Sequence, residues 1–416
     1  MDAPHRLVVA AVLAAAALSR ANAAEWPRFR GPDGAGISDA KTIPVQWTQK
    51  DYNWKVELPG SGHSSPVLWG RRVFLTCADA KTAARIVCAL DADSGQRLWT
   101  REFPSKPYRQ HQFNSYASAS PAADAERVYV AWTTPDEVTL LAFSHDGKTA
   151  WRRTLGTFAA MHGSGSSPVV FGSLVVLAID QKGSQAAIVA VDRRTGETRW
   201  TVPRNNRLAA YGTPTVYRPA AGPPQLLFTS SSQGITSVDP VTGKVVWEVP
   251  DVFPHRCASS PVVAGGVVFG TAGIGGRGRS SAAVRPASPD GSTSAKVAWK
   301  LEGDIPYVPT AVAHGDLLFV WTDQGVVMCL RAATGEKVWQ QKVGANFFGS
   351  PVRVGDRLYC ISMKGDVFVL AASDTYKLLA RNRLGERSYA TPAVAHGRLY
   401  LRTCTHLISV GGARPR

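Results

Sequence analysis

The sequence predicts an all-β fold, an eight-bladed β-propeller of four-stranded blades, and two repeats that run out of phase with each other support this prediction. The first repeat is a proline that follows two small or polar residues. Successive prolines are 55, 47, 46, 47, 48, 42 and 41 residues apart, a period typical of radial or stacked repeats. The eight prolines are Pro66, Pro121, Pro168, Pro214, Pro261, Pro309, Pro351 and Pro392.

The second repeat is a glycine that stands four residues before a tryptophan, as in Gly95 and Trp99. The glycine is able to take positive φ in a hairpin turn, and the preceding Ser, Thr or Asp is able to cap it. The tryptophan then falls on the next strand, where we expect it to pack between blades. The other four pairs are Gly147 and Trp151, Gly196 and Trp200, Gly243 and Trp247, and Gly335 and Trp339.

Each unit contains about four short alternating runs, such as residues 72–75, 128–131 and 357–360. The first unit is preceded by a spare segment with a tryptophan, residues 52–58, and the last unit ends without a Gly-x-x-x-Trp motif of its own. We therefore expect Trp54 and its neighbours to supply the outermost strand of the eighth blade and to close the ring.

Residues 89–99, 190–200 and 237–247 share a pattern that runs from a hydrophobic residue followed by Asp to Gly and then Trp. These segments resemble the repeat of the pyrroloquinoline-quinone (PQQ) propeller family, and the resemblance covers nearly all of the chain after residue 23. The family includes quinone-dependent alcohol dehydrogenases and non-enzymatic scaffolds, among them the propeller of the outer-membrane assembly machine. The chain resembles the secreted non-enzymatic members and the outer-membrane assembly propeller more than the dehydrogenases, and its opening Trp26–Gly34 resembles the leader of many uncharacterised secreted members.

The resemblance implies specific features for an enzyme of this family, namely two adjacent cysteines, calcium ligands of the carboxylate and amide type, and a catalytic Asp. No two of the six cysteines are adjacent, and the segments that enter the blades supply no cluster of Glu, Asn and Asp. We therefore expect no catalytic residues, no metal site and no bound cofactor, neither PQQ nor Ca²⁺.

The first 23 residues predict a signal peptide that is cleaved near Ala23. They contain a basic start, an apolar segment from Leu7 to Leu18, and a small-x-small cleavage pattern. No later segment has the length and apolarity of a transmembrane helix. We expect a periplasmic or secreted protein with a leader at residues 24–51 and a propeller at residues 52–416.

The net charge of +16 favours an anionic neighbour, either an acidic protein or an envelope polymer, and an exported chain rarely meets nucleic acid. A solvated surface without a specific partner is the alternative, because the charges are scattered. We expect a monomer. Among the cysteines, Cys77 and Cys88 flank a hairpin loop and either form a disulfide or stay free.

The mouth of the central channel is the expected binding place, because the innermost strands of all blades converge there. Residues three positions before each proline, and a few slightly further back, predict an aromatic and histidine-rich funnel that suits a sugar ring or an anionic peptide. The alternative is that these side chains only fill the channel. The candidates are His63, Tyr116, His162, Tyr211, His255, Arg256 and Tyr389. The residue three positions before the sixth proline is Pro306.

Two departures from the regular period predict recognition loops on the ring. The segments are Phe103–Ser115, which lengthens the connection into the second blade, and Thr271–Ala295, a tract rich in Gly, Ser and Arg. Both are basic, which matches an acidic partner. Their candidate residues are Lys106, Arg109, His111, Arg277 and Arg279.

These observations favour an exported, non-catalytic propeller that acts as a scaffold or binding protein in protein or envelope interactions. Two alternatives stay open. One is a PQQ-dependent quinoprotein oxidoreductase with a degenerate or small-substrate site, and the other is a carbohydrate-binding propeller.

Overall fold

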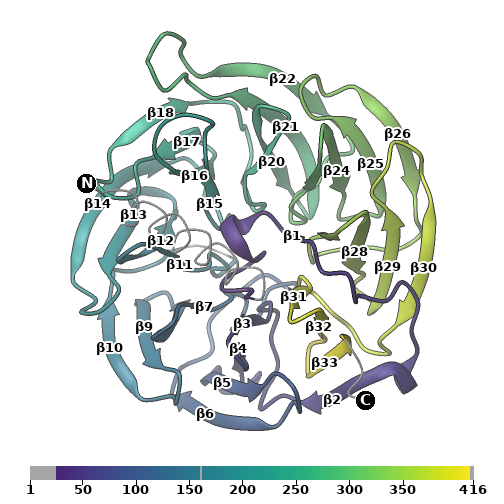
Figure 1. Cartoon of the computed structure of the whole chain (residues 1–416). Coiled ribbons are helices and arrows are strands. Elements are labelled where there is room, and N and C mark those ends of the chain that lie inside the picture. Colours follow the sequence, from purple (N-terminus) through teal and green to yellow (C-terminus); the bar gives the residue numbers. More distant parts are fainter. Residues whose placement is uncertain (1–24, 160–161, 413–416) are drawn as a thin grey trace, which may run out of the picture.

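Eight sheets stand radially around a central channel in the computed structural model, which describes residues 25–159 and 162–412 (Figure 1). The predicted all-β propeller is therefore confirmed. The predicted signal peptide, Met1–Ala23, lies outside the described residues. No helix within residues 25–159 and 162–412 has the length and apolar character needed to cross a membrane.

Within each blade, antiparallel strands follow one another from the channel outwards. The first four blades consist of β3 (Val67–Trp69), β4 (Arg72–Ala78), β5 (Arg85–Asp91) and β6 (Arg97–Phe103); β7 (Ala122–Ala123), β8 (Arg127–Thr133), β9 (Val138–Ser144) and β10 (Thr149–Thr154); β11 (Val169–Phe171), β12 (Leu174–Ile179), β13 (Gly183–Asp192) and β14 (Thr198–Asn206); and β15 (Thr215–Tyr217), β16 (Gln225–Ser230), β17 (Gly234–Val238) and β18 (Val245–Val249).

The other four blades follow the same order, and two of them also contain a strand from the N-terminal segment that precedes β3. They consist of β19 (Val262–Ala264), β20 (Val267–Ile274), β21 (Arg277–Arg285) and β22 (Lys296–Glu302); β23 (Val312–His314), β24 (Leu317–Trp321), β25 (Val326–Arg331) and β26 (Lys337–Lys342); β1 (Ile37–Ser38), β27 (Val352–Val354), β28 (Arg357–Ile361), β29 (Asp366–Ala371) and β30 (Leu378–Arg383); and β31 (Ala393–Ala395), β32 (Arg398–Arg402), β33 (His406–Gly411) and β2 (Tyr52–Glu57).

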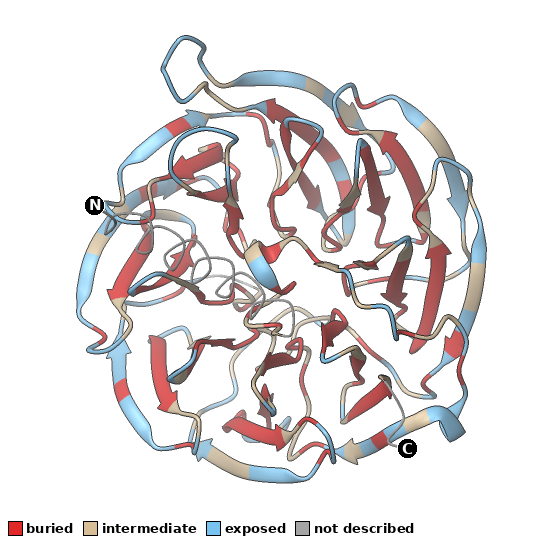
Figure 2. Ribbon diagram, viewed as in Figure 1, coloured by how far each residue is buried: buried red, intermediate tan, exposed pale blue. Residues whose placement is uncertain are grey.

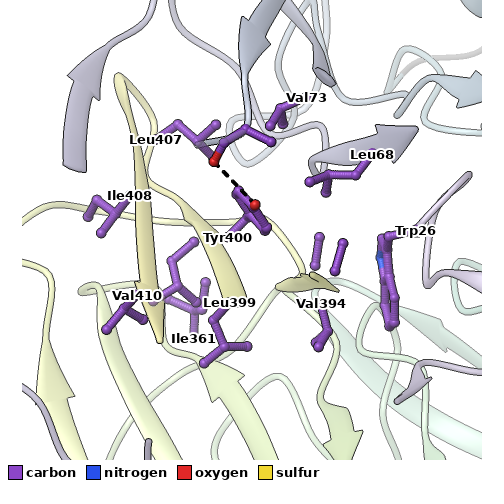
Figure 3. Packing of buried hydrophobic residues seen from close by; sticks show 14 of the residues in the cluster. Trp26, Leu68, Val73, Ile361, Val394, Leu399, Tyr400, Leu407, Ile408 and Val410 are labelled. Atoms are coloured by element: carbon purple, nitrogen blue, oxygen red, sulfur yellow. Dashed lines mark hydrogen bonds between the residues drawn. The ribbon is translucent and has the colours of Figure 1, made fainter. Parts of the chain in front are cut away.

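The eighth blade is closed by the N-terminal strand β2, as the sequence predicts. Trp54 pairs with Ser409 of β33, so both ends of the propeller meet in one sheet. Tyr400 of β32 donates a hydrogen bond of 3.3 Å to the carbonyl oxygen of Ala92 in the first blade (Figure 3). The cluster around Tyr400 also includes Trp26 and Leu68, so leader, first blade and eighth blade share one core (Figure 3).

The recurring tryptophans pack between blades, which confirms their predicted role. An added Cβ at Gly147 would lie 2.7 Å from the indole of Trp99, so only glycine lets the ring of one blade cover the turn of the next. Trp99 also donates a hydrogen bond of 2.8 Å from its indole nitrogen to the carbonyl oxygen of His145. The middle strands of the blades are buried and the outermost strands exposed, so the core lies between blades (Figure 2).

The leader is part of the propeller rather than a separate segment, which the sequence does not indicate. It contains the short 3₁₀ turns η2 (Pro32–Gly34) and η3 (Gln49–Asp51). Trp26 bridges to Leu68 of β3, Asp33 forms an ion pair of 2.9 Å with Arg218 after β15, and β1 pairs in parallel with β27. The leader therefore crosses one end of the channel, with η2 at the centre of the ring (Figure 1).

A buried arginine anchors the leader at that end. The guanidinium of Arg30 is fully buried and donates to the carbonyl oxygens of Thr310, Ala311 and Pro351, at 3.3, 2.7 and 2.9 Å. It also donates to two carbonyl oxygens of its own segment. These bonds join the leader to the innermost strands of the sixth and seventh blades and close the channel there.

Candidate functional site

A ring of eight hydroxyl side chains, one from each blade, surrounds the channel. Each member stands two residues before the innermost strand of its blade. In seven members the backbone N–H donates a hydrogen bond of 2.8 to 3.2 Å to the hydroxyl of the corresponding residue in the next blade. In seven blades the residue that follows is proline, which has no N–H to satisfy. This hydroxyl ring consists of Ser65, Ser120, Ser167, Thr213, Ser260, Thr310, Ser350 and Thr391.

The hydroxyl ring corrects the register of the sixth repeat. Thr310 accepts the bond from Ser260 and donates to Ser350, so Ala311 occupies the place of the recurring proline. Pro309 lies two residues too early, and Pro306 does not line the channel. The segment Thr310-Ala311-Val312 resembles Ser65-Pro66-Val67, with a hydroxyl residue first and Val third but without the proline. This similarity indicates the register of the sixth repeat.

A cavity of about 250 Å³ lies in the channel, and the hydroxyl ring forms part of its wall. Phe29 closes the cavity at the end that the leader crosses. A second circle of residues also lines the cavity. Each of its members stands two positions before a member of the hydroxyl ring in the sequence. Seven of these eight positions are those that the sequence predicts, and Val308 takes the place of Pro306. The circle consists of His63, Ser118, Gly165, Tyr211, Ala258, Val308, Phe348 and Tyr389.

Most of the predicted funnel residues come together here. His63, His162, Tyr211, Arg256 and Tyr389 all line the cavity, and His111 joins them from the connection between β6 and β7. His255 does not line it, and neither does Tyr116.

Tyr116 turns instead into the space between the first and second blades. Its ring lies 5.4 Å from the buried guanidinium of Arg85, and its hydroxyl donates to the carbonyl oxygen of Tyr108. This cation–π contact joins strand β5 to the connection between β6 and β7, so residue spacing could not indicate it.

The connection between β6 and β7 covers part of the cavity mouth. Asn114 donates from its side-chain amide to the carbonyl oxygen of His162 at 2.6 Å, and the His111 and His162 rings lie 5.3 Å apart. Phe113 packs edge-on against Phe348 at 5.4 Å. Phe113 also lines the cavity, although residue spacing does not predict it, because only the path of the loop brings it to the seventh blade.

The second predicted loop is mostly sheet. Thr271–Ile274 belongs to β20 and Arg277–Arg285 to β21, so Arg277 and Arg279 lie in a strand and not in an inserted loop. Only residues 286–295 form an irregular connection within that tract. Gly275 and Gly276 form the tight turn between β20 and β21. Both have positive φ, which glycine adopts readily, and both lie at the cavity mouth.

Burial favours the neutral forms of His63, His162 and Tyr211. It lowers the pKa of His63 to about 3, and the positive charge of Arg402 behind the ring acts in the same direction. Burial also lowers the pKa of His162, assisted by Arg256. It raises the pKa of Tyr211 to about 12, so this hydroxyl stays protonated.

The donor set does not fit a quinone held by calcium. Ca²⁺ takes six to eight oxygen ligands, typically carboxylates, and no Asp or Glu is among the residues that line the cavity. Asp323 lies nearby, but its two carboxylate oxygens accept the backbone N–H groups of Tyr307 and Val308 at 2.7 and 3.1 Å. Residues 25–159 and 162–412 hold no group of three His, Cys, Asp or Glu side chains arranged for a metal.

Cys77 and Cys88 are free thiols in the structure. They lie diagonally on neighbouring strands, since Cys77 faces Ile86 and Cys88 faces Leu75. A hydrogen bond from Cys88 lowers the pKa of the Cys77 thiol against the effect of burial, and Arg402 assists.

Solved structures share this architecture. The crystal structure of BamB from Moraxella catarrhalis has 15% sequence identity and a TM-score of 0.61, over 87% of this chain and 97% of that chain. Quinohemoprotein alcohol dehydrogenase from Comamonas testosteroni has 14% identity and a TM-score of 0.62, over 95% and 82%. A europium-containing methanol dehydrogenase has 13% identity and a TM-score of 0.54, over 94% and 90%. At these identities the likeness concerns the fold alone.

The sequence comparisons point to one branch of this fold. No curated protein matches the chain. The profile of one family matches residues 84–284 and 280–378, which together are well over half of the chain. The chain therefore belongs to the family described as outer membrane protein assembly factor BamB.

Proposed function

We propose that this protein is an exported, non-catalytic interaction scaffold that binds an acidic partner, either a protein or an envelope polymer, at the face where the cavity opens. The antiparallel blades give this face, the mouth face, a defined composition. The connection from each outermost strand to the next blade and the hairpin between the second and third strands both lie on it.

The observation that carries the proposal is the set of unpaired cations on the mouth face. Seven exposed Lys and Arg side chains there have no ion-pair or hydrogen-bond partner among the described residues. They are Lys106, Arg109, Lys182, Arg277, Arg279, Lys364 and Arg387.

The opposite face combines several ion pairs with exposed cationic side chains that have no partner among the described residues, such as Lys244, Lys337 and Lys377. Arg193 lies 3.2 Å from Asp124, and Arg331 lies 2.6 Å from Asp316. Arg71 and Arg398 share Asp93 at 3.1 Å each. Unpaired cations on one face favour association with an acidic surface and steer its approach.

A capture experiment with two matched variants tests the proposal. The mouth variant replaces Lys106, Arg109, Arg277 and Arg279 with Gln. The control variant replaces four exposed, unpaired cations of the opposite face with Gln, namely Arg97, Lys244, Lys337 and Lys377. Tagged proteins capture partners from an envelope extract at 50, 150 and 500 mM salt, chosen to bracket a Debye length of about 8 Å at physiological ionic strength.

We expect the wild type and the control variant to retain the same acidic partner at low salt, and the mouth variant to lose most of it. The difference should vanish at high salt, where screening removes the attraction. Equal capture by both variants would contradict the mouth face as the docking surface.

Two further measurements test the rest of the proposal. Mass spectrometry of the mature protein should place its N-terminus near Ala23 if the chain is exported. Addition of PQQ and CaCl₂ should give no dye-linked alcohol oxidation, and turnover would favour the oxidoreductase alternative.

A further inference from the structure

Four polar side chains around the cavity have no hydrogen-bond partner among the described residues. The Tyr211 hydroxyl is buried and unpaired. The guanidinium of Arg256 and the ring nitrogens of His63 and His162 also line the cavity without a partner. The Tyr211 hydroxyl is therefore available for a hydrogen bond to a molecule that enters the cavity, and satisfying a buried donor of this kind is favourable.

The charge of the cavity favours an anionic group in a ligand. Arg256 carries a positive charge, and none of the other residues that line the cavity is acidic. The Tyr211 hydroxyl keeps its proton and is free to donate it in a hydrogen bond. The backbone N–H of Tyr211 donates to the carbonyl oxygen of Cys257 at 2.8 Å, so Tyr211 and Arg256 come from adjoining segments of the cavity wall. A donor and a cation side by side match a carboxylate, whose two oxygens accept bonds from both.

The opposite part of the wall is aromatic. The rings of His63 and Tyr389 lie 4.3 Å apart, and Phe348 lies 5.7 Å from Tyr389 at 87°. Phe113 from the connection between β6 and β7 completes this cluster at 6.4 Å from Tyr389. Such a wall favours a flat ring over an extended chain.

The shape of the cavity limits the ligand to a small molecule. Its volume of about 250 Å³ is near the lower end of the range for small-molecule sites, which is about 300 Å³. Phe29 closes the far end, so the ligand must enter and leave by the mouth. At the mouth, a Cβ on Gly275 or Gly276 would meet no atom within 4 Å, so space is open beside Arg256.

We propose that the cavity binds a small ring-bearing carboxylate, with the carboxylate between Arg256 and Tyr211 and the ring against His63 and Tyr389. This inference does not depend on the proposed scaffold function, because none of these residues belongs to the mouth variant. Aromatic acids and sugar acids share this chemistry, and the experiment separates them.

Isothermal titration calorimetry of the full mature protein with three probes tests the site. The probes are 4-hydroxybenzoate, glucuronate and the uncharged 4-hydroxybenzyl alcohol. We expect one of the two carboxylates to bind, and the alcohol to bind at least tenfold more weakly than 4-hydroxybenzoate if the aromatic acid is the one that binds. Binding of glucuronate alone would support a sugar acid as the ligand.

Three variants locate the binding. Arg256→Gln removes the charge and should weaken binding of the carboxylate at least tenfold, since hydrogen bonds to charged groups are stronger than those between neutral groups. Tyr211→Phe should weaken it about threefold to tenfold without a change in volume. Lys244→Gln removes an exposed cation on the opposite face and should change nothing, and thermal unfolding of each variant checks that the ring is intact.

Two results would overturn the inference. The first is the absence of binding for both carboxylates at millimolar concentration to the wild type. The second is binding that Arg256→Gln and Tyr211→Phe leave at the wild-type affinity. Neither result affects the scaffold proposal, which rests on the mouth variant.

Discussion

The indole Nε1 of Trp54 donates a hydrogen bond of 3.2 Å to the carbonyl oxygen of Ala92. Trp54 lies on the strand that completes the eighth blade, and Ala92 lies in the hairpin turn of the first blade. An added Cβ at Gly95 of the same turn would lie 2.7 Å from this indole. The contact therefore repeats at the ring closure the packing that joins the other blades.

Trp54→Ala should lower the free energy of unfolding by about 3–5 kcal/mol, because it removes a buried aromatic ring and leaves a cavity at the closure. Urea unfolding measures the change. Leu98→Ala is the control, because Leu98 lies on an outermost strand and is 45% exposed. Equal effects of the two substitutions would mean that the closure contributes no more than an exposed side chain.

Arg30→Lys should lower the free energy of unfolding by about 2–5 kcal/mol. A lysine has three donors and no planar fork, so at least two of the five buried carbonyl oxygens that Arg30 reaches would lose their partner. Arg218→Lys is the matched control, because its ion pair with Asp33 in the same leader is exposed and contributes about 0–1 kcal/mol. A loss as small as that of the control would show that the leader does not depend on Arg30.

Asp323 should make the stability depend on pH. Burial raises its pKa to about 7, although two backbone N–H groups donate to it. The unfolded value is about 3.9, so between these pH values the folded state keeps a proton that the unfolded chain releases. The contribution of Asp323 to the free energy of unfolding should therefore be highest at low pH. It should fall as the pH rises to about 7, by up to about 1.4 kcal/mol per pH unit.

Urea unfolding of the wild type and of Asp323→Asn at pH 4.5, 5.5, 6.5 and 7.5 isolates that contribution. Other groups titrate alike in both proteins, so the difference between them belongs to Asp323. A difference that stays constant across the series would show that this carboxyl titrates at the same pH in both states.

The thiols of Cys77 and Cys88 should both react after denaturation without a reductant. The structure contains six free cysteines, so a thiol assay should count six. A count of four that rises to six after reduction would instead establish a disulfide, and peptide mapping would then show whether it joins Cys77 to Cys88.

The recurring prolines, the Gly-x-x-x-Trp pairs and the spare segment around Trp54 determined the fold from the sequence alone. Each of these residues has a local conformational requirement, and the period between them counts the blades. The same period placed seven of the eight positions in the second circle of the cavity, because equivalent residues of radial repeats face the channel alike. It failed at Thr310, where the hydroxyl was kept and the proline was not.

Only the tertiary structure decided which side chains meet across blades. Trp26 and Arg30 lie far in sequence from the strands that they contact, and no periodicity connects them to the channel. Phe113 and His111 reach the cavity through the path of one irregular loop, and Tyr116 leaves it for Arg85 in the neighbouring blade. Contacts of this kind depend on the spacing and tilt of packed sheets, which the order of residues within one repeat does not specify.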